Sequence, residues 1–399
     1  MDKIQRLELD FLCYKPNHLF KYDSNLYWRP LTESVPIYED LITCKNKIEQ
    51  LYISDSWDKA KKLNNDYELI HLPNKRVKTD SIAKYEPLSR AFFKLWELIH
   101  LFETPLHNSQ KNPIKIIALA EGPGGFIEAL HHWRNIYTPN IKDEIIGVTL
   151  KSTNKEIPGW KKARDFLDNN TTIRIDYCED NTGNLYHVSN LKYLYKHHHN
   201  TVDIVTADGG FDFSDDFNNQ EQKSYRIIFC ECIGALATLK EGGMFICKIF
   251  DTFSRTTISM LQMLKSHFSK VIITKPNTSR PCNSEKYLIC QGFQGIDSHY
   301  LEKCFISISL CEYVTKKNYL LHSLFDEDNI DKQLLSVMER FNEQNAKQQI
   351  FHIEKTLESI KNKRNNYAKI SVQKKKAIEW CKTYNIEINM NSKFIKFKP

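Results

Sequence analysis

The chain has 399 residues, of which 41% are hydrophobic and 26% are charged, as in an ordinary globular protein. This length is too great for one small core, so we expect one large domain with extensions. The sequence contains no run of 18 apolar residues, and the segment Met1–Arg6 has no apolar stretch behind it. These features argue against a membrane span and against a secretory signal.

Cysteine and histidine usage gives no sign of a metal site. The eleven cysteines are scattered, and Cys230-Glu231-Cys232 holds the only close pair. The absence of a Cys-x-x-Cys motif argues against structural zinc, and the run His197–His199 has no partner ligands nearby in the sequence. We expect no metal, and we expect reduced thiols in a cytosol-like compartment.

Positive charge is concentrated at the C-terminal end. From Lys355 onward there are 12 lysines and arginines against 3 glutamates, a charge of 12 − 3 = +9, whereas the whole chain carries +7. The remaining residues therefore sum to 7 − 9 = −2. This asymmetry favours a polyanionic partner such as RNA or DNA. A solvated, lysine-rich helix face is the alternative interpretation.

The first periodic segment follows a region without a clear pattern. Residues 1–80 show no repeat, and we expect a small irregular α/β region packed on the core. In Ser89–Ile99 apolar residues recur at helical spacing, which predicts a helix. Its polar positions Arg90, Lys94 and Glu97 are three to four residues apart and therefore lie on one side.

A glycine-rich loop separates a strand from a helix. The apolar run Ile114–Ala120 predicts a buried parallel strand, and Ile127–Trp133 predicts a helix. Between them stands Glu121-Gly122-Pro123-Gly124-Gly125-Phe126. Glycines here allow backbone N–H groups to approach a ligand at the positive end of the helix. Because the acid at the end of the strand disfavours a phosphate and suits a cation, S-adenosylmethionine fits better than a dinucleotide.

The alternation of strands and helices continues and predicts an open α/β sheet. The expected strands are Glu144–Leu150, Thr172–Asp176, the strand that ends at Ala207, Met244–Phe250, Lys270–Lys275 and Glu285–Phe293. The expected helices are Trp160–Asp168, Glu221–Leu239 and Thr256–Phe268. Glu241-Gly242-Gly243 is a stop signal for the second of these helices. Beyond Gln294 the strand pattern ends, and Asp326–Trp380 is helix-prone.

Two charged residues lie at the ends of apolar strands. Asp208 follows the strand that ends at Ala207, and Lys248 lies in Met244–Phe250. A charged group is costly there unless it is paired or faces a cleft. In an open α/β sheet the cleft lies at the carboxyl ends of the strands, so we expect both residues at a functional site.

Six stretches carry a family likeness: Arg90–Lys94, Glu121–Phe126, Gly147–Lys151, Ala207–Phe211, Gly242–Phe250 and Lys275–Cys290. In order and spacing they resemble the FtsJ/RrmJ-like cap-specific mRNA (nucleoside-2′-O-)-methyltransferases of eukaryotes and large DNA viruses. The resemblance covers about half the chain. It implies a Rossmann-like S-adenosylmethionine-dependent methyltransferase fold with a seven-stranded, mostly parallel sheet and helices on both faces. It also implies an N-terminal extension (1–80), an FtsJ-like domain (81–295) and a helical, basic C-terminal extension (296–399).

The resemblance assigns roles by motif. The catalytic tetrad falls on Lys94, Asp208, Lys248 and Glu285. The cofactor-binding positions fall on Glu121, Gly122, Pro123, Gly124, Gly125, Phe126, Asp180 and Asp208. The candidates for substrate contact are Arg90, Asn218, Ser279, Arg280 and Asn283. Where many methyltransferases have a ribose-binding acid, this chain reads Val148-Thr149-Leu150-Lys151, as the cap-enzyme branch does, and ribose recognition stays open.

The implied activity is methylation of the ribose 2′-hydroxyl of the first transcribed nucleotide of capped mRNA. Such a hydroxyl is a poor nucleophile until its proton is removed or its oxygen is steered. A neutral Lys248, oriented by the carboxylates, could take that proton, and Lys94 could stabilise the developing alkoxide. Lys94 would lower the pKa of Lys248 and the two carboxylates would raise it, so its protonation state stays open. The alternatives are an rRNA ribose 2′-O-methyltransferase and a catalytically silent RNA-binding subunit. The two long extensions disfavour the first, and the complete tetrad disfavours the second.

The expected partner is capped mRNA, together with other capping or transcription proteins and no membrane. The isoleucine-, asparagine- and lysine-rich composition fits an AT-rich genome such as that of a large cytoplasmic DNA virus. We therefore expect a cytoplasmic protein, in a viral factory or virion, and keep the nucleus as the alternative.

Overall fold

One mixed sheet forms the centre of the protein in a computed structural model of the chain. The structure describes residues 5–9, 21–23, 35–52, 56–72, 80–108, 111–151, 154, 159–210, 218–316, 320–323, 330–361 and 366–396. The strands of the sheet are β1 (Gln5–Leu9), β3 (Lys115–Leu119), β4 (Glu144–Val148), β5 (Ile173–Asp176), β6 (Val202–Ala207), β7 (Leu239–Ile249), β8 (Phe268–Lys275) and β9 (Lys286–Phe293). Their order across the sheet is β1-β8-β9-β7-β6-β3-β4-β5.

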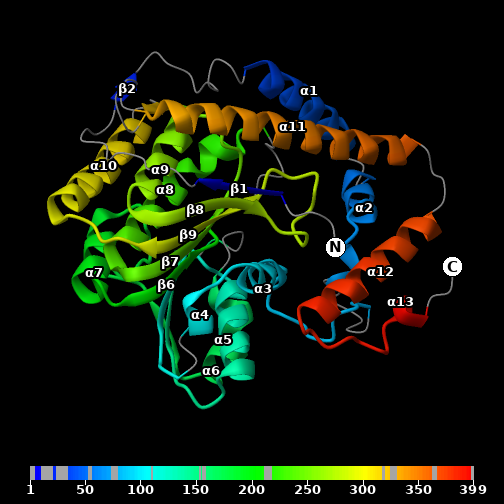
Figure 1. The fold of residues 1–399 in the computed structure, drawn as a ribbon, viewed down its shortest axis with the longest axis horizontal. Coiled ribbons are helices and arrows are strands. Elements are labelled where there is room, and N and C mark those ends of the chain that lie inside the picture. The colour runs from blue at the N-terminus through cyan, green and yellow to red at the C-terminus, as the bar shows by residue number, and fades with distance from the viewer. Residues whose placement is uncertain are drawn as a thin grey trace.

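Helices cover both faces of this sheet and extend beyond it (Figure 1). The helices before β6 are α1 (Val35–Tyr52), α2 (Ser56–Leu63), α3 (Ala91–Leu101), α4 (Pro105–Asn108), α5 (Gly125–Tyr137), α6 (Arg164–Asp168) and α7 (Val188–His198), with the short turns η2 (Glu68–Ile70) and η3 (Trp160–Ala163). Those after β6 are α8 (Gln220–Thr238), α9 (Arg255–Lys265), α10 (Ser298–Lys316), α11 (Lys332–Lys361), α12 (Asn366–Thr383) and α13 (Lys393–Lys396). None of the described helices is long and apolar enough to cross a membrane.

The parallel strands are buried on both faces, as their continuous apolar sequences predict. Strands β3, β4, β5, β6 and β7 run parallel, and their side chains alternate between two layers. Ile116 and Ala118 of β3 pack with α3, α5 and α12, whereas Ile117 and Leu119 pack with α7 to α11. The predicted α/β methyltransferase fold is confirmed.

The sheet has eight strands, one more than expected. The additional strand β1 comes from the N-terminal segment and pairs antiparallel with β8, Gln5 opposite Lys275. Only Leu9 of this strand is fully buried, and the alternation Leu7-Glu8-Leu9 is too short to predict a strand by itself. The seven expected strands are all present as β3 to β9, and β1 is an eighth.

The glycine pair Gly242-Gly243 lies inside a strand and does not end a helix. Helix α8 ends at Thr238, and β7 begins at the next residue. The pairing with β6 shifts there, because Val202 lies opposite Leu239 whereas Ile204 lies opposite Met244. The extra residues form a bulge in which Gly242 has φ +78°, a conformation that favours glycine.

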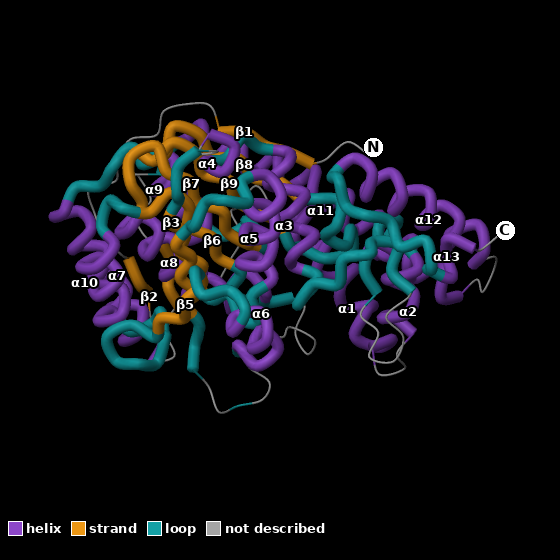
Figure 2. The backbone as a smooth tube through the Cα atoms, turned by 90° about the horizontal axis from the view of Figure 1, so that it is seen from below, coloured by secondary structure: helices purple, strands orange, loops and turns teal. Residues whose placement is uncertain are grey.

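A second correction concerns the segment after Gln294, where no strand was expected. Strand β10 (Leu320–Ser323) pairs antiparallel with β2 (Lys21–Asp23), and strands this short carry no periodic signal. The helical C-terminal extension is confirmed. Figure 1 shows α11 running beside α1, and Figure 2 shows the strands gathered at one end of the molecule with α1, α2, α12 and α13 at the other. Helix α12 buries Trp380 in the layer formed by α3 and α5, so the basic extension packs on the core.

Candidate active site

Four charged side chains meet at the carboxyl edge of the sheet. Glu121 follows β3, Asp208 follows β6, and Lys248 is the penultimate residue of β7. Strand β9 runs antiparallel to β7, with Lys286 opposite Ile249, so Glu285 enters β9 at the same edge. The predicted meeting of strand-end charges therefore occurs where an α/β sheet places its cleft.

The predicted tetrad forms two lysine–carboxylate pairs. The Nζ atom of Lys248 lies 3.0 Å from Oδ1 of Asp208 and donates to the Asp208 carbonyl oxygen at 2.8 Å. The Nζ atom of Lys94, on α3, lies 2.8 Å from the Glu285 carboxylate. These four side chains are 12 to 19% exposed, so a ligand can reach them.

The geometry gives the direction of the Lys248 pKa shift, which the sequence left open, and of the Glu285 pKa shift. Burial favours neutral Lys248, but Asp208 and Glu285 outweigh it and raise the pKa of the Lys248 ammonium. Burial also opposes ionisation of Glu285, yet Lys94 and Lys248 lower its pKa to about 2. Ser279 Oγ and the Tyr287 hydroxyl donate to Glu285 as well, at 3.0 and 3.2 Å. Both shifts favour the charged form, the ammonium of Lys248 and the carboxylate of Glu285.

The loop Glu121–Phe126 provides a buried oxygen without a partner. Glu121 is 2% exposed, and its Oε1 atom accepts the Phe126 N–H at 2.6 Å. Its Oε2 atom has no hydrogen-bond partner among the described residues. Burial, and then the neighbouring Asp208, raise the pKa of Glu121 well above its usual value. A buried carboxylate oxygen of this kind fits a ligand with a positive charge or N–H groups.

The glycines of this loop permit a left-handed turn and close packing against the start of α3. Gly124 has φ +106°, and a Cβ atom at Gly125 would lie 2.2 Å from Oγ of Ser89. The loop of the next strand adjoins it, because the Gly122 N–H donates to Thr149 Oγ1 at 3.4 Å. These residues fit the methionine portion of S-adenosylmethionine, with its amino group and sulfonium, and would hold it at the start of α5.

Asp180, the predicted cofactor-side acid, is engaged locally. Its carboxylate accepts from the Thr182 N–H and hydroxyl, from Asn190 at 2.9 Å and from His187 at 2.6 Å. Burial would raise the pKa of Asp180, but these donors lower it well below its usual value. The loop lies two strands from Glu121 at the sheet edge, and no hydrogen bond between described residues joins Asp180 to Glu121 or Asp208.

The predicted substrate residues fall into a group and an outlier. Arg280 binds Glu68 of η2 with two hydrogen bonds, of 3.0 and 2.7 Å, and Arg90 lies 3.4 Å from the same carboxylate. Asn283 accepts from Ser279 Oγ at 3.4 Å, next to the tetrad. The outlier is Asn218, which donates to Asn46 of α1 and borders residues outside the described part of the chain.

Sequence reasoning missed two acids that support this site. Glu68 lies in the segment treated as irregular, and nothing in its sequence neighbourhood marks it. Glu231 of α8 is fully buried beneath Asp208 and accepts the Gly209 N–H at 3.0 Å. Burial raises its pKa to about 8. A glutamate inside the apolar run Phe229–Ile233 was a usable signal, because a buried acid in a helix needs a partner.

The fold and this edge define a methyltransferase of the α/β class. The family model for FtsJ-like methyltransferases matches residues 87–293, more than half of the 399 residues. The chain therefore belongs to the FtsJ-like methyltransferase family. S-adenosylmethionine is the cofactor that this membership assigns to it, in agreement with the fit of the loop Glu121–Phe126.

Three curated relatives are named for action on capped mRNA. The chain is 32% identical over 227 residues to cap-specific mRNA (nucleoside-2′-O-)-methyltransferase 2 of Drosophila melanogaster, which covers 55% of this chain and 31% of that protein. It is 33% identical over 195 residues to cap-specific mRNA (nucleoside-2′-O-)-methyltransferase 1 of Dictyostelium discoideum, and this match covers 43% of this chain and 24% of that protein. It is 32% identical over 208 residues to cap-specific mRNA (nucleoside-2′-O-)-methyltransferase 1 of Trypanosoma cruzi, and this match covers 50% of this chain and 54% of that protein. The matches thus span about a quarter to a half of these relatives.

Proposed function

We propose that this protein transfers the methyl group of S-adenosylmethionine to the ribose 2′-hydroxyl of the first transcribed nucleotide of capped mRNA. The observation that carries the proposal is the meeting of two lysine–carboxylate pairs beside the unpartnered Oε2 atom of Glu121 at one sheet edge. The names of the relatives supply the substrate class.

Lys248 is the residue that activates the hydroxyl in this proposal. The carboxylate and the carbonyl oxygen of Asp208 hold the ammonium in place. An ammonium has three N–H donors, so one can face the ribose oxygen. Lys248 would first release its own proton to solvent. Its neutral Nζ atom would then take the hydroxyl proton while the ribose oxygen displaces the sulfonium sulfur from the methyl carbon. Lys94, which Glu285 holds in place, stabilises the developing negative charge.

Positioning supplies much of the remaining acceleration. Methyl transfer from a sulfonium is an in-line displacement, and the cofactor supplies only the activated methyl group. Glu121 and the loop that follows it would fix the donor. Ser279 and Tyr287 donate hydrogen bonds to Glu285, and Glu285 in turn holds Lys94 in place beside the acceptor. Rigid support of this kind matters because small displacements of reacting groups cost large factors in rate.

The experiment that tests the proposal is methyl transfer from labelled S-adenosylmethionine to short capped and uncapped RNAs, followed by nuclease digestion and identification of the nucleoside. The expected product is a 2′-O-methyl group on the first nucleotide of capped RNA alone. Label in uncapped or structured RNA would indicate the rRNA-type activity. Cofactor binding without transfer would indicate a silent subunit.

Lys248→Met is expected to lower the transfer rate by about 10²- to 10⁴-fold, because it removes the proton acceptor. The melting temperature and the affinity for S-adenosylmethionine should stay near those of the wild type. The matched control is Lys192→Met, which breaks an exposed lysine–glutamate pair with Glu302 on the surface. Equal rates for the two variants would remove Lys248 from its role.

A further inference from the structure

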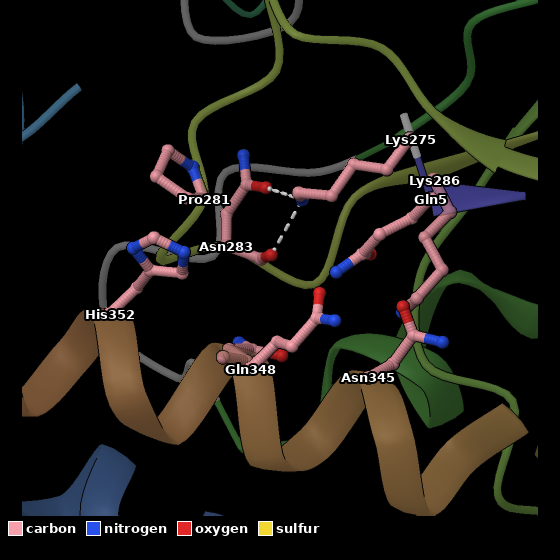
Figure 3. A pocket seen from close by; sticks show the side chains of 9 residues that line it. Gln5, Lys275, Pro281, Asn283, Lys286, Asn345, Gln348 and His352 are labelled. Carbon is pink, nitrogen blue, oxygen red and sulfur yellow. Dashed lines mark hydrogen bonds between the residues drawn. The ribbon is translucent and has the colours of Figure 1, made fainter. Parts of the chain in front are cut away.

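Two lysines lie side by side at the carboxyl edge of the sheet, beyond the tetrad. Lys275 ends β8 and Lys286 begins β9, one position beyond the cross-strand pair Thr274–Tyr287. Both line a pocket with a volume of about 50 Å³ together with Gln5 of β1 (Figure 3). Like charges at facing positions of two strands repel, so this arrangement needs compensation.

The protein compensates these two charges only in part. Lys275 donates to the carbonyl and side-chain oxygens of Asn283, at 2.8 and 2.6 Å, and to the Glu285 carbonyl at 2.8 Å, all of them uncharged acceptors. Lys286 lies 3.5 Å from Asp251, but Lys45 of α1 binds the same carboxylate at 2.9 Å. Lys45 and Lys286 therefore share the carboxylate of Asp251. Burial and then the charge of Lys286 lower the pKa of Lys275 to about 7.

Helix α11 forms the opposite wall of this pocket and contributes neutral hydrogen-bonding groups. Asn345, Gln348, Gln349 and His352 are spaced as one helix face, and Figure 3 shows Asn345, Gln348 and His352 directed into the pocket. None of the described residues that line the pocket is acidic. Amide N–H groups and ammonium groups facing one small space form an anion site.

A second cavity continues the positive lining. Its volume is about 100 Å³, it shares Asn283 and Gln349 with the first pocket, and it is also lined by Lys45, Lys61 and Arg280. No acid is among its described lining residues either. The first pocket lies two strands from Lys248, about 10 Å at the usual strand spacing. The second cavity is lined by residues of α1, α2, α8, α11 and the loop before β9, so it adjoins the first pocket on the side of Asn283 and Gln349.

We propose that the pocket between Lys275, Lys286 and α11 binds a backbone phosphate of the RNA strand that leaves the tetrad. The inference rests on the proposed function, since it supposes an RNA substrate. A phosphate would bring negative charge next to Lys275 and Lys286, and the amides of α11 would donate to its oxygens. Contacts of this kind position a strand without reading its sequence.

Gln348 is the position for the test, because it is exposed on α11 and its substitution leaves the core unchanged. Gln348→Glu is expected to weaken binding of short single-stranded RNA roughly tenfold, equally for capped and uncapped RNA, and to lower the salt slope by about 0.7 to 1. Gln348→Lys should do the reverse. The affinity for S-adenosylmethionine, the melting temperature and the rate at saturating RNA should not change.

The matched control is Gln333→Glu, the same change at an exposed position of α11 about 22 Å away along the helix. Fluorescence anisotropy of labelled RNA at several salt concentrations measures all three variants. If the wild type methylates RNA but Gln348→Glu binds it like Gln333→Glu, the phosphate site is refuted and the proposed function stands. If the wild type binds no RNA, both are refuted.

Discussion

Glu97 of α3 and Glu121 at the end of β3 are both buried carboxylates, yet they belong to different kinds of site. Glu97 accepts four hydrogen bonds: from the Asn277 N–H at 2.8 Å, the Thr278 N–H and hydroxyl at 3.0 and 2.9 Å, and Trp380 Nε1 at 3.2 Å. Glu121 accepts the Phe126 N–H, and its second oxygen has no partner in the described part of the chain.

Burial raises the pKa of both groups, so the direction of a pKa shift does not separate them. What separates them is the number of partners that the protein supplies. Glu97 uses both carboxylate oxygens to join α3, the loop after β8 and α12, three segments far apart in the sequence. Glu121 keeps one oxygen for a group that the chain itself does not provide. Unsatisfied buried atoms, more than shifted pKa values, mark the place of a ligand.

The largest expected effect is a loss of stability when Glu97, whose hydrogen bonds are all made within the protein, is replaced. Glu97→Ala leaves the Asn277 and Thr278 N–H groups and the indole N–H of Trp380 buried without an acceptor. Each such group costs about 1 to 3 kcal/mol, so the free energy of unfolding should fall by about 3 to 5 kcal/mol. Urea unfolding at neutral pH measures it.

Glu97→Gln is the matched control, because it keeps the shape of the side chain and one acceptor oxygen. Its free energy of unfolding should fall by less than half as much as that of Glu97→Ala. A loss below about 1 kcal/mol in Glu97→Ala would show that α12 is not held to α3 through this carboxylate. A second contact joins the same helices, since Trp96 Nε1 donates to the Tyr384 carbonyl oxygen at 2.8 Å.

Substitution of Glu121 should lower the affinity for S-adenosylmethionine without lowering the stability of the protein. Glu121→Gln keeps the acceptor for the Phe126 N–H but removes the negative charge. We expect S-adenosylmethionine to bind about 10- to 100-fold more weakly, because a charge-assisted hydrogen bond contributes about 1.5 to 3 kcal/mol. Isothermal titration calorimetry measures the affinity, and a thermal melt should show an unchanged or higher melting temperature. A destabilised variant with normal affinity would make Glu121 a structural acid like Glu97.

Local patterns were enough to predict the parallel part of the fold and the residues at its edge. The helix expected over Glu221–Leu239 and the strand expected over Thr172–Asp176 each agree with the structure within one residue at either end. Asp208 and Lys248 are charged residues at the ends of otherwise apolar strands, which is why both could be placed at a functional site before the fold was known.

Contacts between distant segments could not be predicted in this way. Glu97 looked like a polar position on the side of a helix, but Trp380, 283 residues later, covers it. Likewise, Lys45 of α1 reaches Asp251 across 206 residues, with no local signal for either partner.

The prediction that the basic tail binds RNA stays a prediction. Because α12 is part of the core, exposed charges such as Lys375 and Lys382 should be reversed in its test, and the tail should not be deleted.

Glu231 lies between the two kinds of site and gives the smallest expected effect. It accepts the Gly209 N–H and the Cys247 thiol at 3.6 Å, and a Cβ atom at Gly209 would lie 2.1 Å from its Oε1 atom. It therefore fixes the turn that presents Asp208 to Lys248. The charged and titratable groups around it are Lys248 and Cys247 on β7, Asp208 after β6, Cys230 and Cys232 on α8, and Tyr186 before α7.

Glu231→Gln is expected to move the pH dependence of methyl transfer while leaving the turn in place. The negative charge of Glu231 helps to raise the pKa of Lys248, so its removal lets Lys248 become neutral at lower pH. The rising limb of the pH–rate profile should shift to lower pH by less than about one unit.

The Glu231→Gln variant should also gain stability relative to the wild type as pH rises from about 4.5 to 8. The reason is that the wild-type carboxyl, with its pKa raised from 4.5 to about 8, favours folding when protonated and loses that contribution as it ionises. A stability difference that does not change with pH, together with an unshifted rate profile, would show that the charge of Glu231 is not coupled to Lys248.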